Sequence, residues 1–130
     1  MRVLLVEDDT GDAERALAAL RELALEAHWV KDGEEALEYV FGSGRYAGRD
    51  PRQAPEVVLL DIKMPKLDGF EVVERLKRSP ARAIPVVVMA SCREEREVLG
   101  AFHLEVAGYV VKPLEREALR AELARVKTPV

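Results

Sequence analysis

The sequence predicts an α/β protein, a single doubly wound (βα)5 domain in which helices cover both faces of a five-stranded parallel sheet. Three observations predict this three-layer sandwich. The chain has 130 residues, enough for one compact core but not for two. Short, continuously apolar runs recur along it, which is typical of strands buried on both faces. Longer segments with helical spacing separate these runs, and this strict alternation favours right-handed βαβ crossovers.

The expected strands are short runs rich in valine and leucine. The second run is the weakest of them. In chain order the five runs are Val3–Val6, Ala27–Val30, Val57–Leu60, Val86–Met89 and Tyr109–Val111.

The expected helices follow the strands, over residues 12–25, 33–41, 68–78, 94–104 and 115–126. Each segment has an apolar stripe facing the sheet and charged residues on the other side. In the first helix the stripe consists of Ala13, Ala16, Leu17, Leu20 and Ala24.

Residues 42–55 interrupt the alternation. Glycine, proline and arginine dominate this segment, so we expect an exposed loop insert between the second helix and the third strand. Neither side of it has enough strands to close a core alone. The prediction is therefore one domain over residues 1–130, with no output domain.

Composition narrows the class of protein. The 20 basic and 24 acidic residues are spread along the chain and give a net charge of −4, which argues against nucleic-acid binding. The single cysteine cannot form an internal disulfide, which fits the reducing cytoplasm. The apolar start is too short for a signal peptide or a membrane span. We therefore expect a cytoplasmic protein that binds neither nucleic acid nor membrane.

Charged residues follow three of the expected strands. Glu7, Asp8 and Asp9 end the first, Asp61 ends the third, and Lys112 ends the fifth. In open α/β sheets the site lies beyond the carboxyl ends of the strands, where the strand order reverses. If the order is 2-1-3-4-5, the first and third strands flank that point. Their acids would then converge, with the lysine reaching in.

Such a cluster has a chemical use. Crowded carboxylates repel one another, and a divalent cation relieves the repulsion; hard oxygen ligands suit Mg²⁺. A carboxylate can attack phosphorus and form an aspartyl phosphate, while the metal and a lysine offset the charge of the transition state. A single acid after a strand is more commonly a helix cap or turn residue. Acids and a lysine on three strand ends together favour function.

The sequence around these residues resembles the receiver domains of response regulators in two-component systems, over about residues 2–126. The motifs are Val6-Glu7-Asp8, then Asp61-Ile62-Lys63-Met64-Pro65-Lys66-Leu67-Asp68-Gly69, and then Tyr109-Val110-Val111-Lys112-Pro113. The resemblance implies the strand order 2-1-3-4-5.

The resemblance also implies a role for each site residue. Asp61 would be the phosphoacceptor, and Lys112 would pair with the phosphoryl oxygens. Mg²⁺ would be the cofactor, bound directly by Asp8 and Asp61, by the backbone carbonyl of Lys63, and through a water by Glu7. Asp9, in contrast, is expected to cap the first helix.

One position departs from the family pattern. Receivers usually carry threonine or serine at the end of the fourth strand, where a hydroxyl bonds the phosphoryl group and couples it to an aromatic residue on the fifth. Here Ala90 takes that place, Ser91 follows it, and the aromatic residue is Tyr109. The hypothesis is that phosphorylation survives while the switch is altered. The Lys112–Pro113 bond is also one that can be cis.

The resulting prediction is a single-domain response regulator in a Mg²⁺-dependent phosphorelay. It would be a signalling protein, and not an enzyme beyond its own phosphorylation and dephosphorylation. The phosphodonor would be a sensor histidine kinase. The insert with Tyr46 and Pro55 and the Lys63–Lys66 segment are similar to regulators paired with phytochrome-type kinases. The downstream protein is open, and so is homodimerisation.

An alternative stays open. A receiver whose switch has decayed could act as a phosphorylation-independent docking module, with Ala90 as the symptom. Two other classes are disfavoured. A nucleotide or flavin binder would need glycines where the first loop has three acids. A phosphatase with an aspartyl intermediate would place a second aspartate where Lys63 stands.

Overall fold

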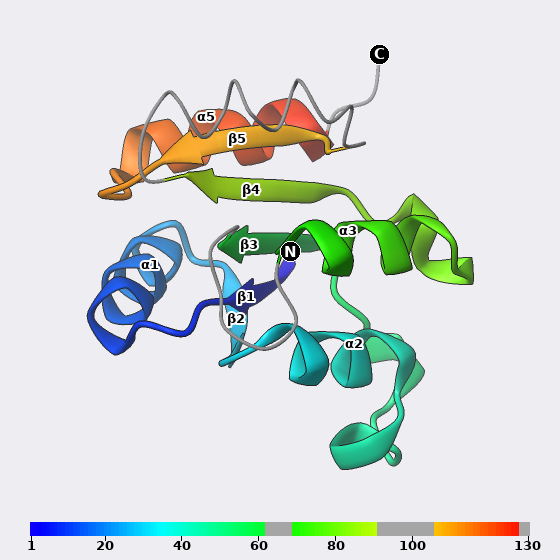
Figure 1. The fold of residues 1–130 in the computed structure, drawn as a ribbon. Helices are drawn as coiled ribbons and strands as arrows, with labels where there is room; N and C mark the ends of the chain where they lie inside the picture. Colours follow the sequence, from blue (N-terminus) through cyan, green and yellow to red (C-terminus); the bar gives the residue numbers. More distant parts are fainter. Residues whose placement is uncertain (62–68, 91–105, 128–130) are drawn as a thin grey trace.

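The sheet has five parallel strands in the order β2-β1-β3-β4-β5, which confirms the predicted fold class (Figure 1). The computed structural model describes residues 1–61, 69–90 and 106–127. The predicted helix over 94–104 lies outside these residues. The strands are β1 (Arg2–Val6), β2 (Glu26–Val30), β3 (Val57–Asp61), β4 (Val86–Ala90) and β5 (Gly108–Val111).

The strand register brings the carboxyl ends of the strands to one edge of the sheet. Val6 of β1 lies opposite Leu60 of β3, and Asp61 lies opposite Met89 of β4. Ala90, the last residue of β4, lies opposite Val111. Because Glu7 and Lys112 directly follow their strands, they and Asp61 reach this same edge.

The helices form the two outer layers. They are α1 (Thr10–Glu22), α2 (Gly33–Phe41), α3 (Gly69–Lys77) and α5 (Arg116–Lys127). Successive strand residues face opposite sides of a sheet. Accordingly, Leu4 and Val6 belong to a buried cluster with residues of α2 and α3. Val3 and Leu5 belong to a second cluster with residues of α1 and α5.

Helix α1 covers Thr10–Glu22, whereas residues 12–25 were predicted. Its N-cap is Asp9, as predicted, and the Asp9 carboxylate accepts a 2.8 Å hydrogen bond from the backbone nitrogen of Asp12. The helix ends at Glu22 and not at residue 25. Ala24, expected on the buried stripe, is exposed and has a φ of 60°, because the chain turns there toward β2.

Residues 42–55, expected as an exposed loop, contain two short 3-10 helices, Gly44–Tyr46 and Pro51–Gln53. The guanidinium of Arg49 donates hydrogen bonds to the backbone oxygens of Tyr39 (2.7 Å) and Val40 (3.0 Å). These oxygens belong to the last turn of α2, whose carbonyls lack helical partners. The insert is thus fastened to α2.

Among the described residues, no helix combines the length and the apolar character that crossing a membrane requires.

Candidate functional site

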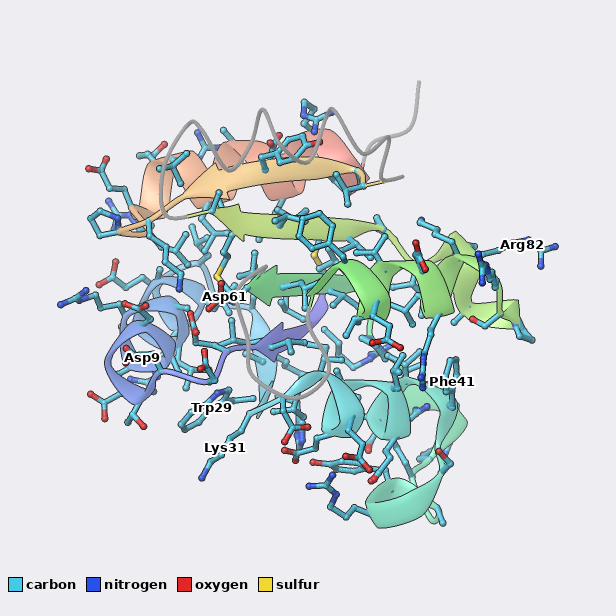
Figure 2. The ribbon with its side chains drawn as sticks, viewed as in Figure 1. Asp9, Trp29, Lys31, Phe41, Asp61 and Arg82 are labelled. Carbon is cyan, nitrogen blue, oxygen red and sulfur yellow. The ribbon has the colours of Figure 1, made fainter. Side chains whose placement is uncertain are left out.

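The ammonium of Lys112 lies among carboxylates at the carboxyl edge of the sheet. Its Nζ is 2.6 Å from Glu7 Oε1, 2.9 Å from Asp12 Oδ2 and 3.2 Å from Asp61 Oδ2. Figure 2 shows Asp61 at the tip of β3, on the side of the molecule where Asp9 lies, with Phe41 and Arg82 at the far end. The structure therefore brings together side chains from β1, β3, α1 and the end of β5.

The backbone around Glu7 is held by the edge strand. Glu7 donates its backbone N–H to the oxygen of Val30 (3.1 Å), and its own backbone oxygen accepts from the indole nitrogen of Trp29 (2.8 Å). Its second carboxylate oxygen accepts from the backbone nitrogen of Asp9 at 3.2 Å. These contacts fix the first residues after β1 before the chain enters α1.

Burial dominates the electrostatics of the site. The Glu7 side chain has no exposed surface, and that of Asp61 is 7% exposed. Burial, together with the hydrogen bond and charge of Asp61, raises the pKa of Glu7 to about 8, although Lys112 acts in the other direction. Burial works to lower the pKa of Lys112, but its hydrogen bonds to Glu7 and Asp12 and the charge of Asp61 outweigh burial and raise it. The site thus holds more negative charge than its lysine offsets.

This excess of charge fits a divalent cation. Glu7, Asp8 and Asp61 each offer a carboxylate oxygen, and these oxygens lie within 4.8 Å of one another. Two of the three carboxylates are buried and Asp8 is exposed, so the group opens to solvent on one side. Hard oxygen ligands with room for water are what Mg²⁺ prefers. The residues present therefore fit the ion that the sequence predicts.

Of the remaining predicted site residues, the structure describes Ala90 and Tyr109. Ala90 is fully buried at the end of β4, and its backbone oxygen accepts from the Lys112 backbone nitrogen at 2.8 Å. Tyr109 on β5 is half-buried against the core on the α2–α3 face. The Lys112–Pro113 bond is cis. Lys63 and Ser91 lie outside the described residues.

The sequence analysis missed Asp12. Its carboxylate joins the site through Lys112, and its other oxygen lies 3.5 Å from the Arg15 guanidinium. A signal was available, because Asp12 follows the predicted cap Asp9 by three residues. Residues at that spacing share a helix face, so an acid there points toward the same edge as the cap.

An acidic group and a lysine at the carboxyl edge of a 2-1-3-4-5 sheet define the class of receiver domains. The comparison with protein families agrees: the model of the response regulator receiver domain matches residues 3–124. The chain belongs to this family of two-component signalling proteins, which are not conventional enzymes.

Among similar proteins of known structure are two bacteriophytochrome response regulators. RtBRR is 39% identical with a TM-score of 0.91, over 99% of this chain and 79% of that one. AtBRR is 40% identical with a TM-score of 0.90, over 99% of this chain and 94% of that one. Response regulator Rcp1 of Synechocystis is 33% identical over 85% of this chain and 75% of its own length. A structure of an Mn²⁺-bound form of Rcp1 has a TM-score of 0.74 and 29% identity, over 97% of this chain and 88% of that one.

Proposed function

We propose that this receiver domain takes a phosphoryl group onto Asp61, with Mg²⁺ held by Glu7, Asp8 and Asp61. One observation carries the proposal: the Lys112 ammonium lies 3.2 Å from a nearly buried Asp61 carboxylate, beside an acidic group suited to a cation. The Mn²⁺-bound form of the similar regulator Rcp1 supports the binding of a divalent ion by this domain.

Each side chain has a part in the transfer. A carboxylate oxygen of Asp61 attacks phosphorus and forms a new O–P bond, while the bond from phosphorus to the donor atom breaks and the donor keeps that electron pair. Lys112 places its positive charge on the phosphoryl oxygens, and its nearness to Asp61 means little rearrangement is needed. Asp8 and Asp61 would hold the ion directly and Glu7 through a water, with the Lys63 carbonyl as a further ligand. When bound, the ion offsets the charge on the transferring group.

The phosphodonor is a sensor histidine kinase, and the proposal is that it is of the phytochrome type. The printed names of RtBRR and AtBRR, at 39% and 40% identity, support this choice. Because Asp8 is exposed while Asp61 is nearly buried, the donor must approach from the open side of the acidic group.

The test is the uptake of one phosphoryl group. The protein is incubated with Mg²⁺ and acetyl phosphate, and its intact mass is followed. The expected result is a gain of one phosphoryl group that Asp61→Asn abolishes and that chelation of Mg²⁺ prevents. A wild-type mass that stays unchanged would contradict the proposal and favour the docking module.

We propose further that the switch is altered at Ala90, where the family places a hydroxyl. Ala90 is fully buried and carries no group that could bond a phosphoryl oxygen. A missing charge-assisted hydrogen bond would weaken the phosphorylated state by about 1.5–3 kcal/mol. In Ala90→Thr, phosphorylation should then change amide exchange around Tyr109 more than in the wild type. Equal changes in the two proteins would refute the altered switch and leave phosphorylation itself untouched.

A further inference from the structure

Lys112 has a third carboxylate partner, Asp12, and this partner comes from α1, not from the ends of the strands. The Asp12 carboxylate lies 2.9 Å from Lys112 Nζ. This distance is longer than that to Glu7 (2.6 Å) and shorter than that to Asp61 (3.2 Å). We propose that Asp12 is a positioning residue, which holds the Lys112 ammonium in place for the incoming phosphoryl group. The inference rests on the proposed function and assigns a residue to it.

The fold fixes Asp12 before any ligand arrives. Its backbone N–H is donated to the capping carboxylate of Asp9 at 2.8 Å, which sets the first turn of α1. One carboxylate oxygen then faces the Arg15 guanidinium at 3.5 Å, while the other faces Lys112. With a partner on each oxygen, this half-buried carboxylate has a defined orientation.

The three carboxylates around Lys112 differ in their other duties. Glu7 and Asp61 belong to the group whose oxygens lie within 4.8 Å of one another, and Asp61 is also the proposed nucleophile. A cation and a phosphoryl group would draw on the oxygens of these two residues. In the acidic group found among the described residues Asp12 is not a member, so its oxygen stays available to the ammonium throughout the transfer.

Holding a lysine has a value because its long side chain loses much freedom when its head group is fixed. Because Asp12 already restricts the Lys112 side chain before the phosphoryl group arrives, less conformational entropy is lost on reaching the transition state. An opposing effect exists, since the Asp12 charge repels the phosphoryl group. The Asp12 side chain is 30% exposed and contacts Lys112 and Arg15, so solvent and two cations weaken the repulsion. Positioning therefore decides the expected sign.

The test compares rates of phosphorylation by acetyl phosphate at saturating Mg²⁺. Asp12→Ala should lower the rate about tenfold, as expected for the loss of one charge-assisted contact. Asp12→Glu should recover most of it, and Asp12→Asn serves if the alanine variant folds poorly. Glu14→Ala is the matched control, because it removes the same charge from an exposed position of the same helix.

A double-mutant cycle shows whether Asp12 acts through Lys112. In a Lys112→Ala background, Asp12→Ala should change the slow remaining rate less than about twofold. An unchanged or faster rate in Asp12→Ala, or an equal loss in both backgrounds, would overturn the proposal.

A second readout does not depend on phosphorylation. In ¹⁵N–¹H spectra of the lysine ammonium groups, the Lys112 signal should be lost or strongly broadened in Asp12→Ala and kept in Glu14→Ala. A signal that Asp12→Ala leaves unaltered would contradict positioning. If the wild type takes no phosphoryl group, the proposed function has failed, and the ammonium signal alone decides whether Asp12 orders Lys112.

Discussion

Two polar clusters of the molecule, one at the carboxyl edge of the sheet and one beside β2 and α2, are built on opposite electrostatic principles. In the acidic cluster Glu7, Asp12 and Asp61 contact the ammonium of Lys112, and a carboxylate oxygen of Asp8 lies close to those of Glu7 and Asp61. The insert cluster contains His28, Glu35, Tyr39 and Tyr46, where the 42–55 segment meets β2 and α2. The acidic cluster has an excess of negative charge, whereas in the insert cluster hydrogen-bond donors are matched to acceptors.

The side chains of the insert cluster are joined by hydrogen bonds and ring stacking. The Tyr46 hydroxyl donates to Glu35 at 2.6 Å and lies 3.0 Å from the His28 Nε2. The His28 ring stacks on Tyr39 with centroids 4.3 Å apart. Burial lowers the pKa of His28, while burial and the bond to Glu35 raise the pKa of Tyr46 to about 12, so both stay neutral near pH 7. The cluster thereby fastens the insert to the fold.

This contrast separates a structural polar cluster from a functional one. Satisfied hydrogen bonds give rigidity and leave nothing for a ligand to supply. An excess of buried carboxylate charge allows a site to respond to cations and to protons. The two clusters should therefore differ most in how their stability depends on Mg²⁺ and pH.

The largest effect is expected from Lys112→Met, which removes the ammonium that Glu7, Asp12 and Asp61 share. Breaking a buried charge pair removes the positive charge beside Glu7 and Asp61, so the metal-free protein should lose about 3 kcal/mol of unfolding free energy near pH 8. The loss should shrink as the pH falls, because Glu7 then takes up a proton, and Mg²⁺ should restore part of it. Urea unfolding with and without Mg²⁺ measures this. A loss that neither pH nor Mg²⁺ alters would show that charge is not what Lys112 supplies.

A smaller effect is expected in the pH dependence of Mg²⁺ binding. The pKa of Glu7 is raised from 4.5 to about 8, so the folded metal-free protein binds a proton that the unfolded chain releases. Its stability should fall as the pH rises through that window. Mg²⁺ binding expels the proton, so the affinity should rise up to about tenfold per pH unit below pH 8.

The fluorescence of Trp29 is a suitable measure, because this single tryptophan donates to the Glu7 backbone oxygen. Calorimetry in buffers of different ionisation heat would count the protons released. Glu7→Gln should flatten the pH dependence. If it remains as steep in that variant, the titrating group is not Glu7.

The sequence predicts the sheet and the strand-end residues of the site because both depend on local patterns. Buried parallel strands are continuously apolar, and the register of a parallel sheet brings Glu7, Asp61 and Lys112 to one edge. Asp9 as N-cap was predictable for the same reason, since capping is a matter of residue type and spacing.

Contacts that depend on side-chain direction were harder to predict. Asp12 reads as an ordinary acid in the first turn of a helix until tertiary structure places Lys112 beside it. The predicted end of α1 was wrong because Ala24 suits a helix by propensity, whereas in the structure it has a positive φ in the turn toward β2. Residues 42–55 look polar and glycine-rich, yet Arg49 and Tyr46 fasten them through contacts that no periodicity reveals.

The smallest of the three effects is expected from Tyr46→Phe in the insert cluster. The variant leaves the Glu35 oxygen and the His28 Nε2 without the hydroxyl between them, which should cost about 1–2 kcal/mol of unfolding free energy. Unlike Lys112→Met, this loss should be the same with and without Mg²⁺, and phosphoryl uptake should be unchanged. Tyr39→Phe is the matched control, because within the described parts of the chain the Tyr39 hydroxyl makes no hydrogen bond, and it should cost under about 0.5 kcal/mol. A Tyr46→Phe loss that depends on Mg²⁺ would mean that the two clusters are coupled through β2, and the contrast between them would not hold.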